Sequence, residues 1–171
     1  MFALLSVYTV YAQTNRTANL KINDTLPALS FIDMNDQTIN IDSVTKGKPM
    51  LLVFYKADWC GPCIDHLDEL KPYYKSLNIK GIKMYAITTQ PVQTMKETIT
   101  KYGFKFPLLK DEGGASCTRL GNIAAGMPIQ TIIITDSKHV VRYIYSSVDL
   151  KERPISEDVY QEALRIYDTY K

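Results

Sequence analysis

The chain has 171 residues, of which 46% are hydrophobic and 22% are charged. This length and composition are typical of one globular domain with a substantial core. The 20 Lys and Arg residues nearly balance the 18 Asp and Glu residues, and the net charge is +2. Since no block of like charge stands out, the composition predicts no nucleic-acid surface and no membrane surface. Three cysteines are too few for a disulfide scaffold, and two of them form a Cys-x-x-Cys pair, which favours chemistry over architecture.

The first 12 residues, MFALLSVYTVYA, are apolar and end in Val10-Tyr11-Ala12 ahead of a polar stretch. This small-x-small ending is typical of a secretory signal peptide, and the run is too short to span a bilayer. We therefore expect residues 1–12 to be the remnant of a signal peptide that is cleaved near Ala12. The protein would then be periplasmic or otherwise exported. Because a basic start is missing, a buried first strand is the alternative interpretation.

Residues 20–171 show no repeat or linker and are predicted to form one domain. Apolar and polar residues alternate on both sides of Asn35-Asp36, which predicts a hairpin over 28–42. The continuous apolar run at 51–56 predicts a buried central strand. Apolar residues then recur at helical spacing up to Leu77, which predicts a helix that starts at the cysteine pair and is kinked by Pro72.

Strands and helices alternate through the rest of the chain. We predict strands at 83–89, 106–110, 127–136 and 139–147, and helices at 92–103, 116–121 and 156–170, the last with Ser156 as its N-cap. Because this alternation ends in an antiparallel pair of strands, it predicts an α/β fold. Its central mixed β-sheet is flanked by helices on both faces, after an N-terminal hairpin.

The motif ADWCGPC at residues 57–63 carries the chemistry. A thiolate attacks a disulfide, and the free amides and dipole at a helix N-terminus stabilise that anion at Cys60. Cys63, one turn later, is placed to close an intramolecular bridge. A zinc site would lack ligands, because only Cys117, His66 and His139 remain, and a bridge over so short a loop adds little stability. We therefore expect a working redox pair and no metal, with Cys117 as a packing residue.

WCGPC at a strand-to-helix junction, followed some sixty residues later by Met127-Pro128 at the start of a strand, resembles the thioredoxin superfamily. Within it, the leading hairpin and the strand–helix insertion at 81–112 look like the TlpA/ResA-type exported thiol-disulfide oxidoreductases and the related AhpC/TSA group. The resemblance implies a thioredoxin-like fold and an enzyme that exchanges electrons with protein disulfides, as a reductant and without a cofactor. It also implies disulfide-bearing substrate proteins and a thiol reductase as electron donor.

The same resemblance assigns roles to five residues. It makes Cys60 the exposed nucleophile and Cys63 the buried resolving thiol. Trp59, Met127 and Pro128 would contact the substrate, with Pro128 as a cis-proline that faces the disulfide.

Three positions depart from the family pattern. Phe54 stands six residues before the first cysteine, where thioredoxins carry a buried acid. His66 stands where exported relatives often carry Glu, so it either tunes the thiols or is an ordinary surface residue of the helix. Lys56 either favours the thiolate through its charge or is simply solvated.

Two other functions remain open at this point. A thiol peroxidase of the peroxiredoxin type needs a Pro and a Thr or Ser ahead of the nucleophile, and the hydroxyl helps to orient the peroxide. This chain has Val53 and Ala57 at those places, which argues against efficient peroxide reduction. A Cu(I)-binding module is the other alternative, with Cys60, Cys63 and Met127 as soft ligands.

Overall fold

The computed structural model describes residues 17–150 and 152–170. The proposed leader, residues 1–12, lies outside this range, so the expected signal peptide stays a prediction. Within this range the chain contacts the rest of the domain already ahead of Leu20. The backbone amide of Asn19 donates to the carbonyl of Leu120 over 3.2 Å. Thr25 also forms an isolated bridge with Val140. No helix of the described residues is both long enough and apolar enough to cross a bilayer.

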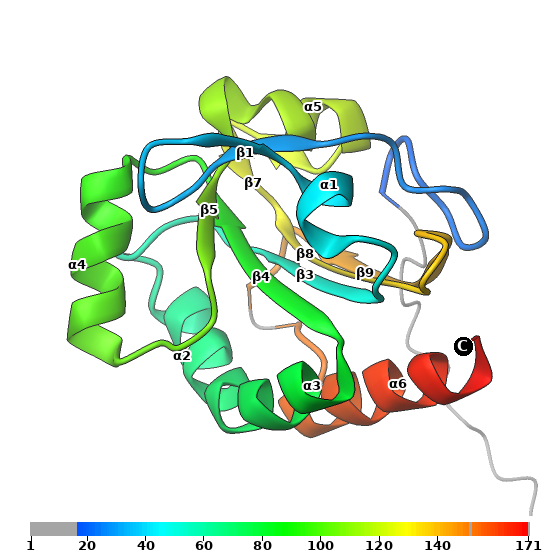
Figure 1. Cartoon of the computed structure of the whole chain (residues 1–171). Helices are drawn as coiled ribbons and strands as arrows, with labels where there is room; N and C mark the ends of the chain where they lie inside the picture. The colour runs from blue at the N-terminus through cyan, green and yellow to red at the C-terminus, as the bar shows by residue number, and fades with distance from the viewer. Residues whose placement is uncertain (1–16, 151, 171) are drawn as a thin grey trace, which may run out of the picture.

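A mixed, seven-stranded sheet forms the centre of the described chain, with strand order β2-β1-β5-β4-β3-β8-β9 (Figure 1). Its strands are β1 (Ser30–Ile32), β2 (Thr38–Asn40), β3 (Met50–Phe54), β4 (Lys83–Thr88), β5 (Leu108–Lys110), β8 (Gln130–Thr135) and β9 (Val141–Ser147). The strands β3, β4 and β5 run parallel, whereas β8 pairs antiparallel with β3 and with β9. The predicted central mixed sheet is confirmed.

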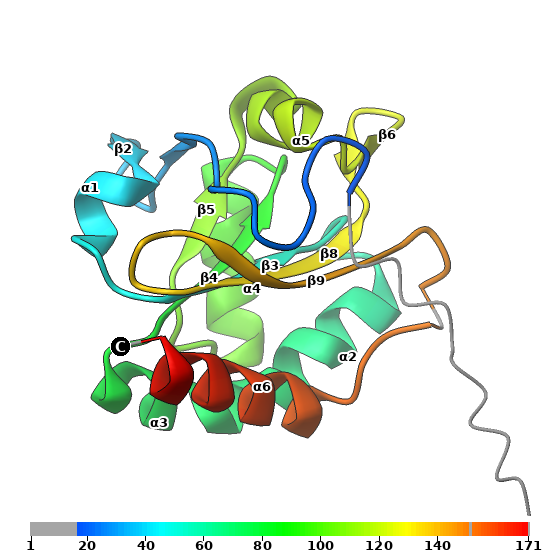
Figure 2. The ribbon, with the colours of Figure 1, turned by 90° about the vertical axis from the view of Figure 1, so that its right-hand side faces the viewer.

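Helices cover both faces of this sheet (Figure 2). One face packs against α2 (Gly61–Leu70), α3 (Tyr74–Lys80), α4 (Val92–Tyr102) and α6 (Ser156–Thr169), and the other carries α1 (Ile41–Thr45) and α5 (Ala115–Leu120). Alternation along β3 explains why its sequence is apolar throughout. Leu51 and Val53 pack in the core on the side of α2, α3, α4 and α6, and Leu52 and Phe54 pack in the core on the side of α1 and α5. Both faces of the strand are therefore buried.

Pro72 divides the long predicted helix into two helices, where the sequence predicted only a kink. A 3₁₀ turn, Lys71–Tyr73, separates α2 from α3, which is consistent with the backbone donor that proline lacks. The short helix α1 was not predicted and overlaps the end of the hairpin expected at 28–42. It forms because the side chain of Asn40 accepts hydrogen bonds from the amides of Asp42, at 2.9 Å, and Ser43.

Two other expected boundaries need correction. Ile155, not Ser156, is the N-cap residue of α6, and the hydroxyl of Ser156 instead donates to Glu69 of α2 over 3.1 Å. The strand expected at 127–136 is split. Its first residues form β7 (Met127–Pro128), which pairs with β6 (Ile123–Ala124) in a separate hairpin.

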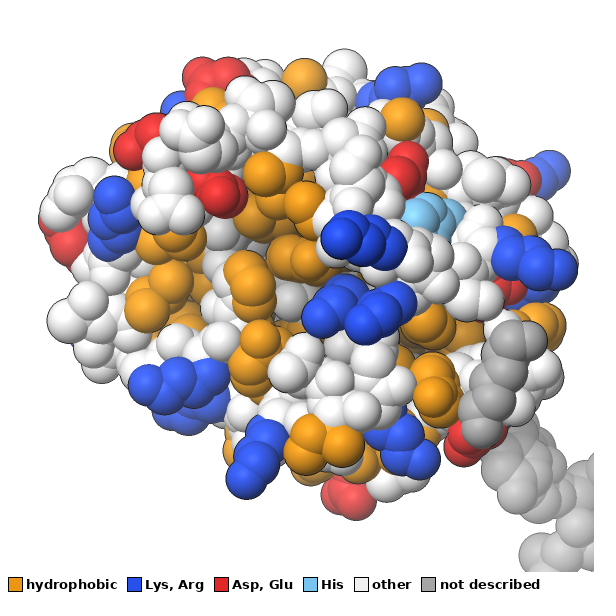
Figure 3. All heavy atoms as spheres, in the orientation of Figure 1, with side chains coloured by type: hydrophobic (Ala, Val, Ile, Leu, Met, Phe, Trp, Pro, Cys, Tyr) orange, Lys and Arg blue, Asp and Glu red, His pale blue; other side chains and the backbone are white. Residues whose placement is uncertain are grey.

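The face seen in Figure 3 carries acidic and basic side chains interspersed, with apolar side chains between them. No large field of one sign is visible there. This distribution agrees with the near-balanced charge of the sequence.

Candidate redox-active site

Cys60 and Cys63 lie where the central strand meets the first long helix. Cys60 is the N-cap residue of α2, and Pro62 occupies the first turn, as the motif predicts. The amides of Cys63 and Ile64 both donate to the carbonyl of Cys60 over 3.0 Å. The two sulfur atoms are bonded, and the Cα atoms are 5.3 Å apart. The predicted intramolecular bridge is therefore present.

Cys60 is not exposed in this disulfide form, contrary to the sequence-based expectation. Only 4% of Cys60 and 1% of Cys63 are accessible. Trp59 is exposed at 65%, and Gly61 and Pro62 of the same motif are also exposed. The ammonium group of Lys56 lies 5.2 Å from the centroid of the Trp59 ring. Lys56 is thus partly buried against an aromatic face rather than freely solvated.

The turn ahead of Cys60 is fixed by a neighbouring loop. The amide of Asp58 donates to Gln90 Oε1 over 2.8 Å, and Gln90 Nε2 donates to Asp58 Oδ1 over 2.5 Å. Thr88 Oγ1 also donates to the carbonyl of Lys56 over 3.3 Å. The last residue of β4 and the loop after it therefore position the residues that lead into the redox pair. The sequence did not indicate this role.

Tyr55, the residue directly after β3, shares a core with the cysteines, and Phe54 does not. Tyr55 belongs to the same core cluster as Cys60 and Cys63, whereas Phe54 packs on the other face of the sheet. Burial, and then the charge of Asp58, raise the pKa of the Tyr55 hydroxyl, so it stays neutral. The period-two alternation of a strand is the signal that could have identified this residue.

His66 is buried, so its interpretation as a surface residue is wrong. It is 1% exposed and its Nδ1 lies 3.1 Å from Gln130 Nε2. Burial lowers the pKa of His66 from 6.5 to about 4; Arg153 adds to this effect and Glu69 opposes it. His66 is therefore a neutral, buried imidazole one turn beyond Cys63. Nothing in the sequence pointed to Gln130 as its partner.

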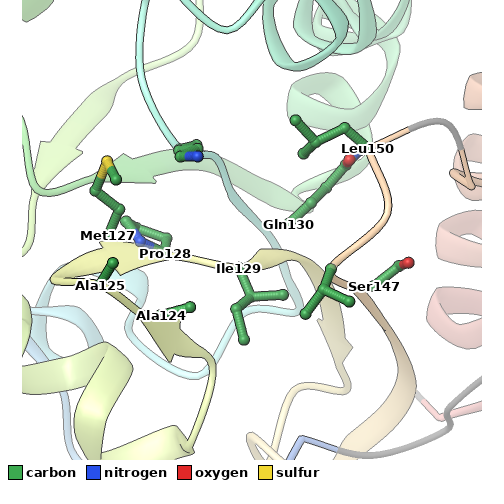
Figure 4. Close-up of a pocket in the computed structure, with 10 residues that line it drawn as sticks. Ala124, Ala125, Met127, Pro128, Ile129, Gln130, Ser147 and Leu150 are labelled. Carbon is green, nitrogen blue, oxygen red and sulfur yellow. The ribbon is translucent and has the colours of Figure 1, made fainter.

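Met127, Pro128 and Lys56 line one pocket, and Figure 4 shows Met127 and Pro128 in its wall. Its volume is about 160 Å³. The other lining residues come mainly from the β6–β7 hairpin, the start of β8 and the segment after β9: Ala124, Ala125, Ile129, Gln130, Ser147, Val148 and Leu150. The walls are mostly apolar, and neither cysteine is among the lining residues.

Pro128 is not a cis-proline, because all described peptide bonds are trans. The chain reverses instead at Ala125 and Gly126, which have positive φ angles of 50° and 75°. This two-residue turn pairs Met127 with Ala124 and Pro128 with Ile123 in antiparallel register. A cis bond is therefore not needed for the reversal.

The remaining cysteine is a packing residue. Cys117 is fully buried beside Asp111, whose carboxylate accepts the amides of Ser116 and Cys117 over 2.8 Å each. Burial, with the charge of Asp111, raises the pKa of the Cys117 thiol. Within the described ranges, no group of three or more His, Cys, Asp or Glu side chains is arranged to hold a metal ion.

Comparison with known proteins gives the family. A model of the AhpC/TSA family matches residues 22–144, so the chain belongs to the AhpC/TSA family. It is 28% identical over 134 residues to "Peroxiredoxin Q, chloroplastic" of Triticum aestivum, covering 77% of this chain and 61% of that relative. It is 29% identical over 128 residues to "Alkyl hydroperoxide reductase E" of Mycobacterium bovis, covering 72% of this chain and 84% of that protein.

Solved structures share the fold. Peroxidoxin BcpB from Mycobacterium tuberculosis superposes with a TM-score of 0.74 at 22% identity, over 85% of this chain and 97% of its own. A provisionally assigned protein disulfide isomerase from Bacteroides thetaiotaomicron gives a TM-score of 0.71 at 16% identity, over 87% of this chain and 91% of its own. The thioredoxin-like fold and the AhpC/TSA part of the expected resemblance are confirmed. The TlpA/ResA-type part stays a prediction.

The buried His66 predicts a loss of stability in acid. The unfolded chain protonates His66 below pH 6.5, whereas the folded protein does so only near pH 4. Its stabilising effect is complete above pH 6.5 and is lost as the pH falls toward 4, by about 3 kcal/mol in total. Urea unfolding at about pH 7 and about pH 4.5 measures this loss. His66→Gln should remove this part of the pH dependence and the control His139→Gln should retain it; equal slopes in both variants would contradict the assignment.

Proposed function

We propose that this chain is a redox enzyme in which Cys60 attacks an oxidant and Cys63 resolves the product. The observation that carries the proposal is the disulfide across the first turn of α2, with Cys60 at the N-cap. Free backbone amides at this position favour the thiolate of Cys60. Cys63, inside the first turn and 1% exposed, is suited to the second, intramolecular step.

A peroxide is the first candidate for the oxidant. The relatives named above are a peroxiredoxin and an alkyl hydroperoxide reductase, and this likeness favours a thiol peroxidase over an exported protein-disulfide reductase. The Cys60 thiolate would attack the terminal peroxide oxygen and form a sulfenic acid, and the second oxygen would leave as an alcohol or water. Cys63 would then attack the Cys60 sulfur, releasing water and leaving the disulfide. A thiol reductase would restore the dithiol.

A protein disulfide is the second candidate, and the residues ahead of Cys60 favour it. Val53 and Ala57 are apolar and buried, so they supply no hydroxyl to orient a peroxide. The nearby pocket is lined mainly by apolar groups, and the exposed Trp59 adds a surface for a polypeptide. Cys60 would form a mixed disulfide with the substrate, and Cys63 would displace the reduced substrate thiol.

The two candidates are separated by the reaction rates of the reduced protein. A thiol peroxidase should react faster with hydrogen peroxide or an organic hydroperoxide than with an oxidised protein such as insulin, as followed by mass spectrometry of the Cys60–Cys63 bond. Ala57→Thr supplies the missing hydroxyl, and Ala57→Val is its control because Val has the shape of Thr without the hydroxyl. The Thr variant should react with peroxide about tenfold faster than the Val variant, because one hydrogen bond to developing charge contributes about 1.5 kcal/mol or more. A wild-type protein that reduces insulin faster than any peroxide would rule out the first candidate.

The division of labour between the thiols is tested by trapping. Cys63→Ser removes the resolving thiol, so it should accumulate a Cys60 sulfenic acid or a mixed disulfide, depending on the oxidant. Cys60→Ser should accumulate almost none, and Cys117→Ala should behave as wild type because Cys117 is fully buried. Equal trapping in both serine variants would show that the assignment of attacker and resolver is wrong.

We also propose that the protein is exported. The support is the apolar segment that ends in Val10-Tyr11-Ala12. A protein exported in this way has a mature chain that begins at Gln13, which mass spectrometry of the native protein measures. A native chain that retains Met1 would contradict export by cleavage at this site.

A further inference from the structure

Gln130 is a buried amide that connects the pocket to the active-site helix. It is 2% exposed and lines the pocket, and in Figure 4 its side chain extends from the strand toward Leu150. Its Nε2 lies 3.1 Å from Nδ1 of His66. Burying two polar side chains costs free energy, and the cost is reduced when they form a hydrogen bond with each other.

The pairing determines where the imidazole carries its hydrogen. An amide nitrogen can only donate, so Nδ1 of His66 must accept the hydrogen bond from Gln130. A neutral imidazole has one hydrogen on its two nitrogens, and that hydrogen must then lie on Nε2. His66 therefore presents a hydrogen-bond donor, not a base, at its other edge.

The surroundings of His66 keep the ring neutral. Burial lowers its pKa to about 4. The charged groups that act on it are Arg153, from the segment before α6, and Glu69, one turn along α2. These two groups bond to each other over 2.7 Å, so their effects on the ring largely oppose one another. A charged imidazolium is therefore excluded near neutral pH.

The Nε2 donor has no hydrogen-bond partner in the described part of the chain. His66 follows Cys63 by three residues, which places both side chains on one face of α2 with Cβ atoms about 5–6 Å apart. Both residues are 1% exposed. In the disulfide form the Cys63 sulfur is uncharged and a weak acceptor, whereas a thiolate there would be a strong one.

We propose that Gln130 is a positioning residue that holds His66 as the Nε2–H tautomer, and that this hydrogen bonds to the Cys63 thiolate formed when the disulfide opens. The inference rests on the dithiol cycle of the proposed function. An incoming thiolate forms a bond to the Cys60 sulfur, the Cys60–Cys63 bond breaks, and Cys63 leaves with the electron pair. His66 transfers no proton in this step. It stabilises the leaving thiolate and lowers the pKa of Cys63.

The tautomer can be measured directly by NMR of protein with ¹⁵N-labelled histidine. The chain has only two histidines, so His139→Gln assigns the signals. We expect the Nε2–H form in the wild-type protein at neutral pH, in both redox states. In Gln130→Glu the new carboxylate accepts from the ring, so the hydrogen should move to Nδ1. A wild-type ring with its hydrogen on Nδ1, or with both nitrogens protonated, overturns the proposal.

The effect on Cys63 is measured in a Cys60→Ser, Cys117→Ala background, where Cys63 is the only thiol. The ¹³Cβ shift of labelled cysteine reports its ionisation without any substrate. Gln130→Met should lower the acid dissociation constant of Cys63 about tenfold, the size expected for loss of one hydrogen bond to a charged group. Thr131→Val is the matched control and should leave the constant unchanged. Thr131 follows Gln130 in β8, so its side chain lies on the opposite face of the strand, where its hydroxyl is 2.9 Å from that of Ser146.

Equal constants in Gln130→Met and Thr131→Val would overturn the proposal even if His66 has the expected tautomer. Both NMR measurements are made without turnover. A chain that fails to cycle with peroxide or protein disulfide would therefore disprove the proposed function while leaving the Gln130–His66–Cys63 interaction open to the same two tests.

Discussion

The burial of β3 on both faces determines where the redox pair lies. Met50–Phe54 pairs parallel with β4 and antiparallel with β8, and all five residues are inaccessible. A slip of one residue would move every side chain to the opposite face, so the register of such a strand is strongly fixed. The turn after β3 and the start of α2 are fixed with it. The position of Cys60 at a helix N-terminus is thus a consequence of core packing.

The groups around the disulfide are mostly neutral. Tyr55 and His66 are buried, and burial holds each in its uncharged form. Arg153 is paired with Glu69, and Phe54 faces the other core. The free backbone amides at the N-terminus of α2 favour a thiolate at Cys60, and they do not titrate. Fixed dipoles of this kind stabilise the anion at any pH, because they carry no proton that can be lost or gained.

Patterns local in sequence predicted most of the fold and the core of the site. The apolar run of β3, the helical stripe after Cys63 and the spacing of the two cysteines were sufficient for the central strand, α2 and the disulfide. The short helix α1 and the β6–β7 hairpin were missed because each depends on one or two residues, the Asn40 cap and the Ala125–Gly126 turn. The partners Gln90 and Gln130 could not be predicted, since each contact joins residues 32 or 64 positions apart.

Peroxide cleavage and thiol–disulfide exchange need hydrogen-bond donors at different atoms of this site. Cleavage of a peroxide places charge on a small leaving oxygen, which needs hydrogen-bond donors already in position. Ala57 stands in place of a hydroxyl residue, and the backbone amides at the start of α2 are hydrogen-bond donors near Cys60. A thiol–disulfide exchange places the charge on sulfur, and a donor such as the Nε2–H of His66 beside Cys63 is suited to that anion. The buried Gln130–His66 pair therefore supports the opening and closing of the Cys60–Cys63 bond with either oxidant, because Cys63 must ionise in both reactions.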